Sequence, residues 1–148
     1  MRISVAADSL DGVARLIPAT LEALGHEVSA YGALAEGAEP GDPRTVWSAC
    51  ARAAALEVAD GLADQAIVAC WTGTGASIAA NKVAGIRAAL CTDAATAAGA
   101  RRWNDANVLA LSLRLTSAPV LVEIIEAWFG ADPSSQADDI AAIGLLEP

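Results

Sequence analysis

The sequence predicts an α/β fold: a single doubly wound, Rossmann-like sheet of five parallel strands with helices on both faces. Two observations support this prediction. Apolar, strand-like runs alternate with helical segments along the chain, and strands in that order pair in parallel and are covered on both faces. The length of 148 residues suits one domain. We place this domain at residues 1–130 and expect residues 131–148 to form a tail that either docks on a partner subunit or is partly disordered.

The strands are expected at short apolar runs bounded by polar or turn-forming residues, a pattern typical of buried strands. They are residues 3–7, 26–31, 67–70, 86–91 and 108–111. In doubly wound folds, ligands bind beyond the carboxyl ends of the strands. Asp8, Cys70 and Thr92 stand at such ends, so we expect a site there.

Helices are expected where apolar residues recur at helical spacing. They are residues 13–24, 43–61, 78–82, 94–103 and 119–129. Gly25 closes the first of them, and Pro43 suits the first turn of the second. The acidic, Gly- and Pro-rich residues 36–43 form the loop between them. The last helix, 119–129, is amphipathic.

The formal net charge of −9 is unevenly distributed along the chain. Residues 65–117 hold 5 basic and 2 acidic side chains, whereas residues 118–148 hold 6 acidic and no basic ones. An anionic ligand should therefore meet the middle of the chain. So acidic a protein is a poor candidate for binding nucleic acid, which needs a broad basic face.

The cellular setting is expected to be the cytoplasm. No window of about 18 residues is free of charge or strong polarity, and the chain enters a strand directly, so we expect neither a membrane span nor a signal peptide. Three cysteines, an odd number without metal-ligand spacing, favour free thiols in a reducing compartment. Cys50 and Cys91 lie within apolar runs, where a core role is expected. His26, the one histidine, is expected to be structural.

A glycine-punctuated stretch, Trp71-Thr72-Gly73-Thr74-Gly75-Ala76-Ser77, follows the third strand. A strand, two closely spaced glycines and a helix present free backbone N–H groups, which favour an anion. The alternative interpretation is a tight turn whose glycines serve packing only. The stretch lacks the Lys-Ser/Thr ending of a nucleoside-triphosphate loop, and the dinucleotide fingerprint is incomplete.

Longer motifs give this stretch a specific resemblance. Residues 70–91, CWTGTGASIAANKVAGIRAALC, resemble the signature of the ribose-5-phosphate isomerase B and galactose-6-phosphate isomerase family. Residues 104–109, NDANVL, resemble its second motif. Asp8 after the first strand, and residues 24–32, match in order and spacing. The resemblance covers roughly residues 2–130 and makes this part a sugar-phosphate-isomerase-like domain.

The resemblance implies an aldose–ketose isomerisation of a phosphorylated sugar through a cis-enediolate, without metal or organic cofactor. It implies Cys70 as the base and Thr72, with the backbone N–H groups that follow, as the stabiliser of the enediolate oxygens. Asn104 would bind substrate hydroxyls and Arg114 the phosphate. The expected substrate-binding residues are Asp8, Ser9, Trp71, Gly73, Thr74, Gly75, Ala76, Ser77, Trp103, Asn104 and Arg114.

The chain also departs from the family. Ser9 stands where a histidine commonly follows the aspartate, and Trp103 replaces the histidine that opens the sugar ring. Trp71 replaces a small residue of the loop. Relatives carry phosphate-binding arginines near the C-terminus, but residues 115–148 contain no Arg or Lys.

Three interpretations follow from these departures. The substrate could be linear, such as a four-carbon sugar phosphate that needs no ring opening. The protein could instead be a non-catalytic sugar- or anion-binding relative, or a subunit of a mixed assembly with a paralogous chain. A third interpretation is a different reaction, with Trp71 and Trp103 lining a pocket for a less polar substrate.

The resemblance also implies an oligomer, since family members are dimers or tetramers with sites between subunits. The helix 119–129 offers a broad apolar surface that a monomer would cover poorly. Its members are Val120, Leu121, Ile124, Ile125, Trp128 and Phe129. We therefore expect a homodimer or a homotetramer, unless a paralogous chain is the partner.

Overall fold

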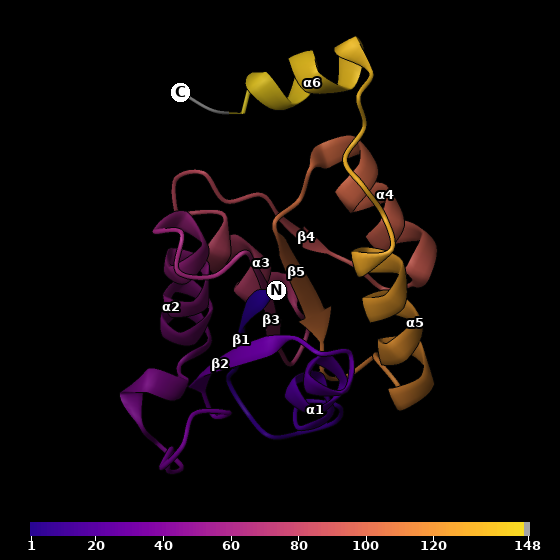
Figure 1. Ribbon diagram of the computed structural model, residues 1–148. Coiled ribbons are helices and arrows are strands. Elements are labelled where there is room, and N and C mark those ends of the chain that lie inside the picture. Colours follow the sequence, from indigo (N-terminus) through magenta and orange to yellow (C-terminus); the bar gives the residue numbers. More distant parts are fainter. Residues whose placement is uncertain (147–148) are drawn as a thin grey trace.

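Five parallel strands form one sheet in the computed structural model, which describes residues 1–146 (Figure 1). The strands are β1 (Arg2–Ala7), β2 (Glu27–Gly32), β3 (Gln65–Cys70), β4 (Ala88–Leu90) and β5 (Val108–Ser112). Their order across the sheet is β2-β1-β3-β5-β4, and every neighbouring pair is parallel. The predicted doubly wound sheet of five parallel strands is confirmed.

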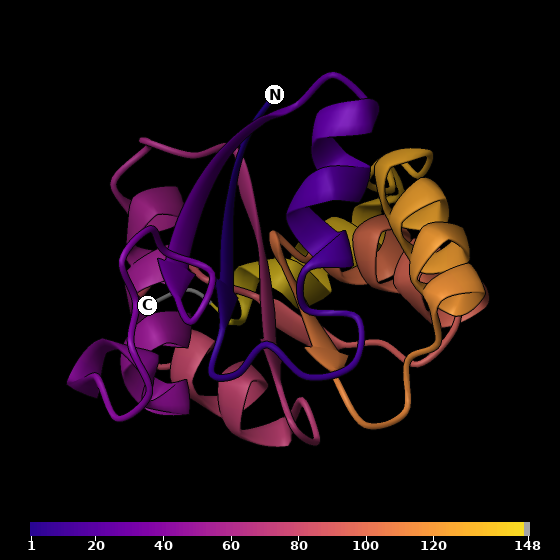
Figure 2. The same ribbon diagram turned by 90° about the horizontal axis from the view of Figure 1, so that it is seen from below.

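Helices cover both faces of the sheet. They are α1 (Leu16–Ala23), α2 (Trp47–Ala59), α3 (Thr74–Ala80), α4 (Ala94–Asn104), α5 (Ala118–Phe129) and α6 (Ala137–Gly144), with the 3₁₀ turn η1 (Pro43–Thr45) ahead of α2. Figure 2 shows α1, α4 and α5 on one side of the strands and α2 and α3 on the other. Each face has its own core, the first rich in Ile and Leu and the second in Ala. Small side chains let α2 and α3 approach the sheet and each other closely.

The apolar surface of α5 is buried within the chain, which makes the expectation of an uncovered face wrong. Leu121, Ile124, Ile125 and Trp128 are each 0 % exposed, because α1 and α4 pack on α5 from the same face of the sheet. Amphipathicity predicted the helix correctly but could not show that the chain itself covers it. The apolar face of α5 is therefore not available as an oligomer interface.

Residues 131–146 leave the core and form an additional helix, so the helix 119–129 is not the last one. The backbone N–H of Ser134 donates to the carbonyl of Arg102 (2.7 Å), and α6 contacts α4. The arrow of β5 points away from α6 in Figure 1, so α6 lies by the amino ends of the strands. Ile140 on α6 and Leu145 directly after it are 56 % and 88 % exposed.

Within residues 1–146, no helix is long and apolar enough to cross a membrane.

Candidate active site

The loops that follow the three central strands meet at the carboxyl edge of the sheet. Ala7 pairs with Ala69 across β1 and β3, and Cys70 pairs with Ser112 across β3 and β5. Parallel strands therefore bring the residues after Ala7, Cys70 and Ser112 to one place. Asp8 and the glycine loop 71–77 start from this edge, as the strand ends predicted, and so do Ser9 and Arg114, which the family resemblance added.

Hydrogen bonds join the loop after β5 to the loop after β3. The backbone N–H of Leu113 donates to the carbonyl of Cys70, and that of Arg114 to the carbonyl of Trp71, each at 3.0 Å. The Ser112 hydroxyl also donates to the Trp71 carbonyl (3.0 Å). The exposed cation of Arg114 thus starts from backbone that is fixed beside Cys70 and Trp71.

Gly73 is required by the backbone and by close packing. It precedes α3 with φ of 76°, and a Cβ there would lie 2.5 Å from Cδ1 of Leu90 and 2.8 Å from the carbonyl carbon of Leu111. Only glycine adopts this conformation without strain and fits the space. Gly73 therefore serves both a tight turn and close packing, which is compatible with a binding role for the loop.

The first turn of α3 contributes backbone donors at the same edge. Helix geometry leaves the N–H groups of Thr74, Gly75 and Ala76 without a preceding helical carbonyl. The N–H of Ser77 differs, since it donates to the carbonyl of Gly73 (3.0 Å) and is already used. The hydroxyls of Thr72 and Thr74 are hydrogen bonded to each other at 2.8 Å.

Cys70 and Asp8 supply the thiol and the carboxylate of this edge. Cys70 is 5 % exposed. One carboxylate oxygen of Asp8, Oδ1, is buried and has no hydrogen-bond partner within the described residues. Burial, followed by the nearby charge of Asp11, raises the pKa of Asp8, although the backbone N–H groups of Asp8, Ser9 and Trp71 oppose the shift. An unpaired, buried carboxylate oxygen is suited to accept a hydrogen bond from a ligand hydroxyl.

The hydroxyl of Ser9 is already hydrogen bonded, and the thiols of Cys50 and Cys91 are inert. The Ser9 hydroxyl donates to Oδ2 of Asp11 (2.9 Å). Burial raises the pKa of Cys50 to about 12 and that of Cys91 to about 11, so both thiols stay protonated at neutral pH. Both lie in the core, as expected.

A cavity of about 380 Å³ opens beside Asp8. Asp8, Ser9 and Leu10 line one wall, and the loop after β2, from Ala33 to Thr45, lines the other. This cavity is large enough for a small polar molecule.

Sequence reasoning missed Trp47, which also belongs to the carboxyl edge. It is the first residue of α2 and is 44 % exposed. A Cβ on Gly75 would lie 2.9 Å from Cε3 of its ring, so the indole rests on the glycine loop. No local pattern predicts a contact between residues so far apart in the chain.

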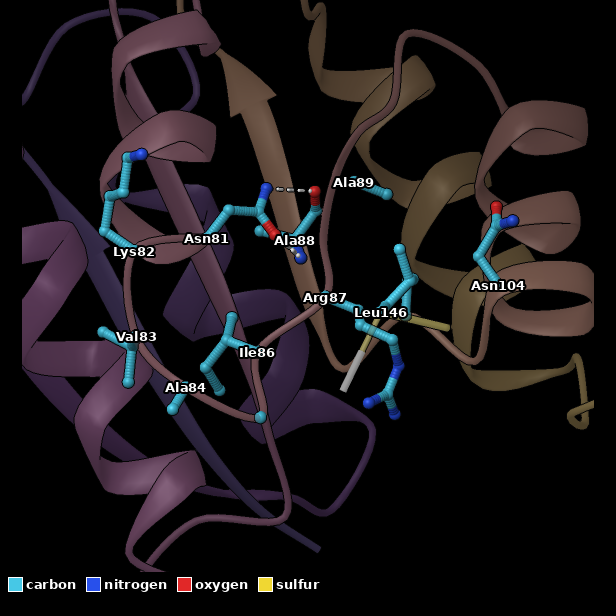
Figure 3. A pocket seen from close by; sticks show the side chains of 12 residues that line it. Asn81, Lys82, Val83, Ala84, Ile86, Arg87, Ala88, Ala89, Asn104 and Leu146 are labelled. Atoms are coloured by element: carbon cyan, nitrogen blue, oxygen red, sulfur yellow. Dashed lines mark hydrogen bonds between the residues drawn. The ribbon is translucent and has the colours of Figure 1, made fainter. Parts of the chain in front are cut away.

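Asn104 and Trp103 lie at the opposite edge of the sheet. They end α4, which runs back from the carboxyl edge, and the next strand starts at Val108. Asn104 borders a cavity of about 640 Å³ between the loop 81–87, the start of β4 and Leu146 (Figure 3). One chain therefore does not bring Asn104 and Trp103 together with Cys70, although the sequence placed all three in one site.

Trp103 lies beside the edge strand β4. Trp103 is 57 % exposed, and its ring packs back on Gly99, where a Cβ would lie 2.7 Å from Cζ3. A shallow groove between β4 and α4 is lined by Leu90, Gly99 and Trp103, among others. Residues 1–146 contain no cluster of three His, Cys, Asp or Glu side chains that could hold a metal ion.

Comparison with known proteins shows the family to which the chain belongs. The family model described as Ribose/Galactose Isomerase matches residues 3–143. The chain belongs to the ribose/galactose isomerase family. Ribose-5-phosphate isomerase B of Clostridium thermocellum superposes with a TM-score of 0.84 at 34 % identity, covering 99 % of this chain and 95 % of that one.

Two curated relatives are similar to this chain in sequence. Ribose-5-phosphate isomerase B of Escherichia coli is 46 % identical over 88 residues, which span 60 % of this chain and 59 % of the relative. The D-erythrulose-4-phosphate isomerase of Pectobacterium atrosepticum is 37 % identical over 111 residues, 74 % of this chain and 73 % of the relative. The family match extends past residue 130, where the sequence resemblance ended, and includes most of α6.

Proposed function

We propose that this chain is an aldose–ketose isomerase that acts on a small phosphorylated sugar through a cis-enediolate. The supporting observation is the position of Cys70, at the end of β3 between the Asp8 carboxylate and the glycine loop, in a chain of the ribose/galactose isomerase family. The Cys70 thiolate would remove the proton from the hydroxyl-bearing carbon next to the carbonyl and return it to the former carbonyl carbon, while the hydroxyl proton passes to the former carbonyl oxygen. No net oxidation or reduction occurs.

The donors around Cys70 suit the charge that develops during this reaction. When the proton leaves, negative charge moves to the carbonyl oxygen, and preorganised donors stabilise it. The Thr72 hydroxyl and the backbone N–H groups of Thr74 and Gly75 fill this role. Asp8 would accept a hydrogen bond from a substrate hydroxyl, and Arg114 would bind the phosphate.

We propose a linear substrate, a four-carbon sugar phosphate. Trp103 stands where the family's ring-opening histidine is expected, and no other histidine lies nearby in the sequence. A tetrulose whose terminal hydroxyl is phosphorylated cannot close a furanose ring, so it needs no such acid. Two relatives bear the name D-erythrulose-4-phosphate isomerase and are 37 % and 35 % identical to this chain.

We further propose that two copies share each site. Asn104 and Cys70 lie at opposite edges of one sheet, and β4 is an edge strand. If a two-fold axis lies beside β4 and makes the strands of the two copies antiparallel, the carboxyl edge of one sheet lies beside the amino edge of the other. Ile78 on α3 and Trp103 on α4 flank β4 on its two faces and are 59 % and 57 % exposed. Burying them would favour this dimer, and exposed Ile140 and Leu145 would extend it.

Isomerase assays on tetrulose and pentulose phosphates, with Cys70→Ala as the control, test the reaction. We expect turnover of the tetrulose phosphate, slower turnover of the pentulose phosphate, and none with Cys70→Ala. Equal inactivity on both sugars would contradict the proposal. Mixing Cys70→Ala with Asn104→Ala chains tests the shared site, because one of the two sites in a mixed dimer is then intact. No recovery of activity on mixing would contradict the shared site.

A non-catalytic sugar-phosphate-binding subunit is the second candidate, favoured by the absence of basic residues from 115–148. It predicts binding of the sugar phosphate without turnover, and turnover only after a paralogous chain is added. Calorimetry with the sugar phosphate, run beside the assay, separates the two functions.

A further inference from the structure

We propose that Asp105 is a positioning residue: held between Arg87 and Arg101, it fixes the turn that presents Asn104 to the site of a second copy. The inference rests on the proposed function, which makes Asn104 a substrate-binding residue. It assigns a role to a residue that does not itself reach the reacting atoms.

The backbone of Asp105 has an unusual conformation. Within residues 1–146 it is the one non-glycine residue with positive φ, at 42°, and it ends α4 directly after Asn104. This left-handed conformation is unfavourable for a residue with a Cβ and persists only when the surroundings enforce it. The direction in which the chain leaves α4 thus depends on what holds Asp105.

Two arginines hold the Asp105 carboxylate. Its Oδ2 accepts from Nη2 of Arg87 (3.0 Å) and its Oδ1 from Nη1 of Arg101 (3.2 Å). Nε of Arg87 also donates to the Asp105 carbonyl (2.9 Å). The side chains of Arg87 and Arg101 are 17 % and 11 % exposed and that of Asp105 is 38 % exposed, so these charge-assisted bonds are only partly shielded from water and salt.

The arginines are themselves anchored in different parts of the fold. Arg101 donates to the carbonyl of Ala106 and lies over the ring of Trp128, 5.6 Å from its centroid. The Trp128 indole N–H donates to Oε1 of Gln65 at the start of β3 (2.6 Å). The turn is thereby tied to α5 and to β3.

A second anchor comes from Asn107 on the other side of the turn. Its Oδ1 accepts from the backbone N–H of Arg87 (2.8 Å), and its Nδ2 donates to the carbonyl of Gly85 (2.9 Å). The turn is therefore also fixed to the segment that leads into β4.

Asn104, in contrast, has no hydrogen bond from its side chain to any residue of the described part, and it is exposed. Nothing but its backbone orients it before a ligand arrives. Because Asp105 is the next residue, its clamp sets where the Asn104 amide points. Misplacement of a binding group by about 1 Å can cost about 100-fold in rate.

Asp105→Gly removes the clamp but keeps the freedom to adopt positive φ, so it is the variant of choice. We expect it to lower kcat on the sugar phosphate by about 10- to 100-fold. In an Asn104→Ala background the same change should cost less than about twofold, because Asp105 acts through Asn104. Ser4→Ala, which removes a buried hydrogen bond far from the turn (Oγ to the carbonyl of Ala54, 2.7 Å), is the control for general loss of stability. It should leave kcat unchanged.

Mixed dimers give a second readout that loss of stability would not reproduce. Asp105→Gly chains should regain activity when mixed with Cys70→Ala chains and gain none when mixed with Asn104→Ala chains. A full loss of kcat from Asp105→Gly in the Asn104→Ala background, or recovery with Asn104→Ala chains, would overturn the inference.

Hydrogen exchange tests the clamp without any substrate. Asp105→Gly should raise the exchange rates of the amides of Ala106 and Asn107, which donate to the carbonyls of Ala100 and Arg87, by about tenfold or more. Unchanged exchange would overturn the clamp. If the wild-type protein shows no isomerase activity while exchange rises as expected, the proposed function fails and the clamp stands without a positioning role.

Discussion

The indole of Trp47 lies directly against Gly75: a Cβ on Gly75 would fall 2.9 Å from Cε3 and 3.1 Å from Cδ2 of the ring. Trp47 begins α2 and Gly75 lies in the first turn of α3. The φ angle of Gly75 is not positive, so its conformation does not demand glycine. The close approach of the Trp47 ring requires glycine at this position, and it places the indole beside the candidate site.

We expect Gly75→Ala to displace the Trp47 ring. Overpacking of this kind costs about 1–3 kcal/mol of the free energy of unfolding. In a Trp47→Ala background the methyl group has room, so the same change should cost less than about 0.5 kcal/mol. Urea denaturation of the two single variants and the double variant measures the coupling; additive losses would show that the ring is not pressed on Gly75 in solution.

Gly73 should be far less replaceable than Gly25, although both have positive φ, at 76° and 83°. A Cβ on Gly25 has nothing within 4 Å, so Gly25→Ala should cost only about 1–2 kcal/mol from the conformation itself. Gly73→Ala adds a clash with backbone of Leu111, which cannot move aside, for about 1–3 kcal/mol more. Equal midpoints in urea for the two variants would contradict this difference.

The doubly wound sheet was predictable because its strands and helices carry strong periodic patterns. The helix that the sequence analysis did not predict, α6, has a weaker signal. It is only eight residues long, and its apolar residue Ile140 is exposed, so no burial pattern marks it. On α5 the apolar face was predicted correctly, but periodicity cannot say which element covers it. In the structure α1 and α4 cover Leu121 and Trp128.

The candidate site was predictable where it depends on strand ends, and not where it depends on contacts distant in sequence. Asp8 follows one parallel strand and Cys70 ends another, so the sequence already placed both at the carboxyl edge, whereas Arg114 came from the family resemblance and the structure supplies the strand order that brings it beside them. Asn104 precedes a strand instead of following one. The same rule places it at the opposite edge, which a motif match does not reveal. Trp47 reaches the site through helix packing, for which the sequence has no local signal.

Asp8 should lower stability at neutral pH. A raised pKa means that the folded chain binds the proton more tightly than the unfolded chain, so stability falls as the pH rises through the folded pKa. Asp8→Asn, uncharged at every pH, should be more stable than wild type at pH 7. The advantage should shrink as the pH falls towards the ordinary value of 3.8. Thermal unfolding between pH 3 and 8 tests this, and a pH-independent difference would contradict it.

Asp8→Asn should also be impaired in isomerisation, since the buried oxygen would lose its charge. Stability gained together with activity lost is the signature of a group retained for function. Asp11→Asn is the matched control, because Asp11 raises the pKa of Asp8 and its carboxylate receives the Ser9 hydroxyl. It should change stability less than Asp8→Asn does.

Deleting residues 133–148 should weaken the proposed dimer while leaving the fold of one chain intact. The last buried residue before the tail is Ala131, and the main contact of α6 with another described element is with α4. If Ile140 and Leu145 are buried by a second copy, each contributes about 1.5–3 kcal/mol to association, and even half of one such term changes the dissociation constant several-fold. We therefore expect the deletion to raise that constant at least about tenfold in sedimentation analysis, with little change in the far-UV spectrum beyond the lost helix. Ile140→Asp should reproduce most of the effect. A dissociation constant equal to that of wild type for both variants would place α6 outside the interface and leave β4, Ile78 and Trp103 as its entire apolar surface.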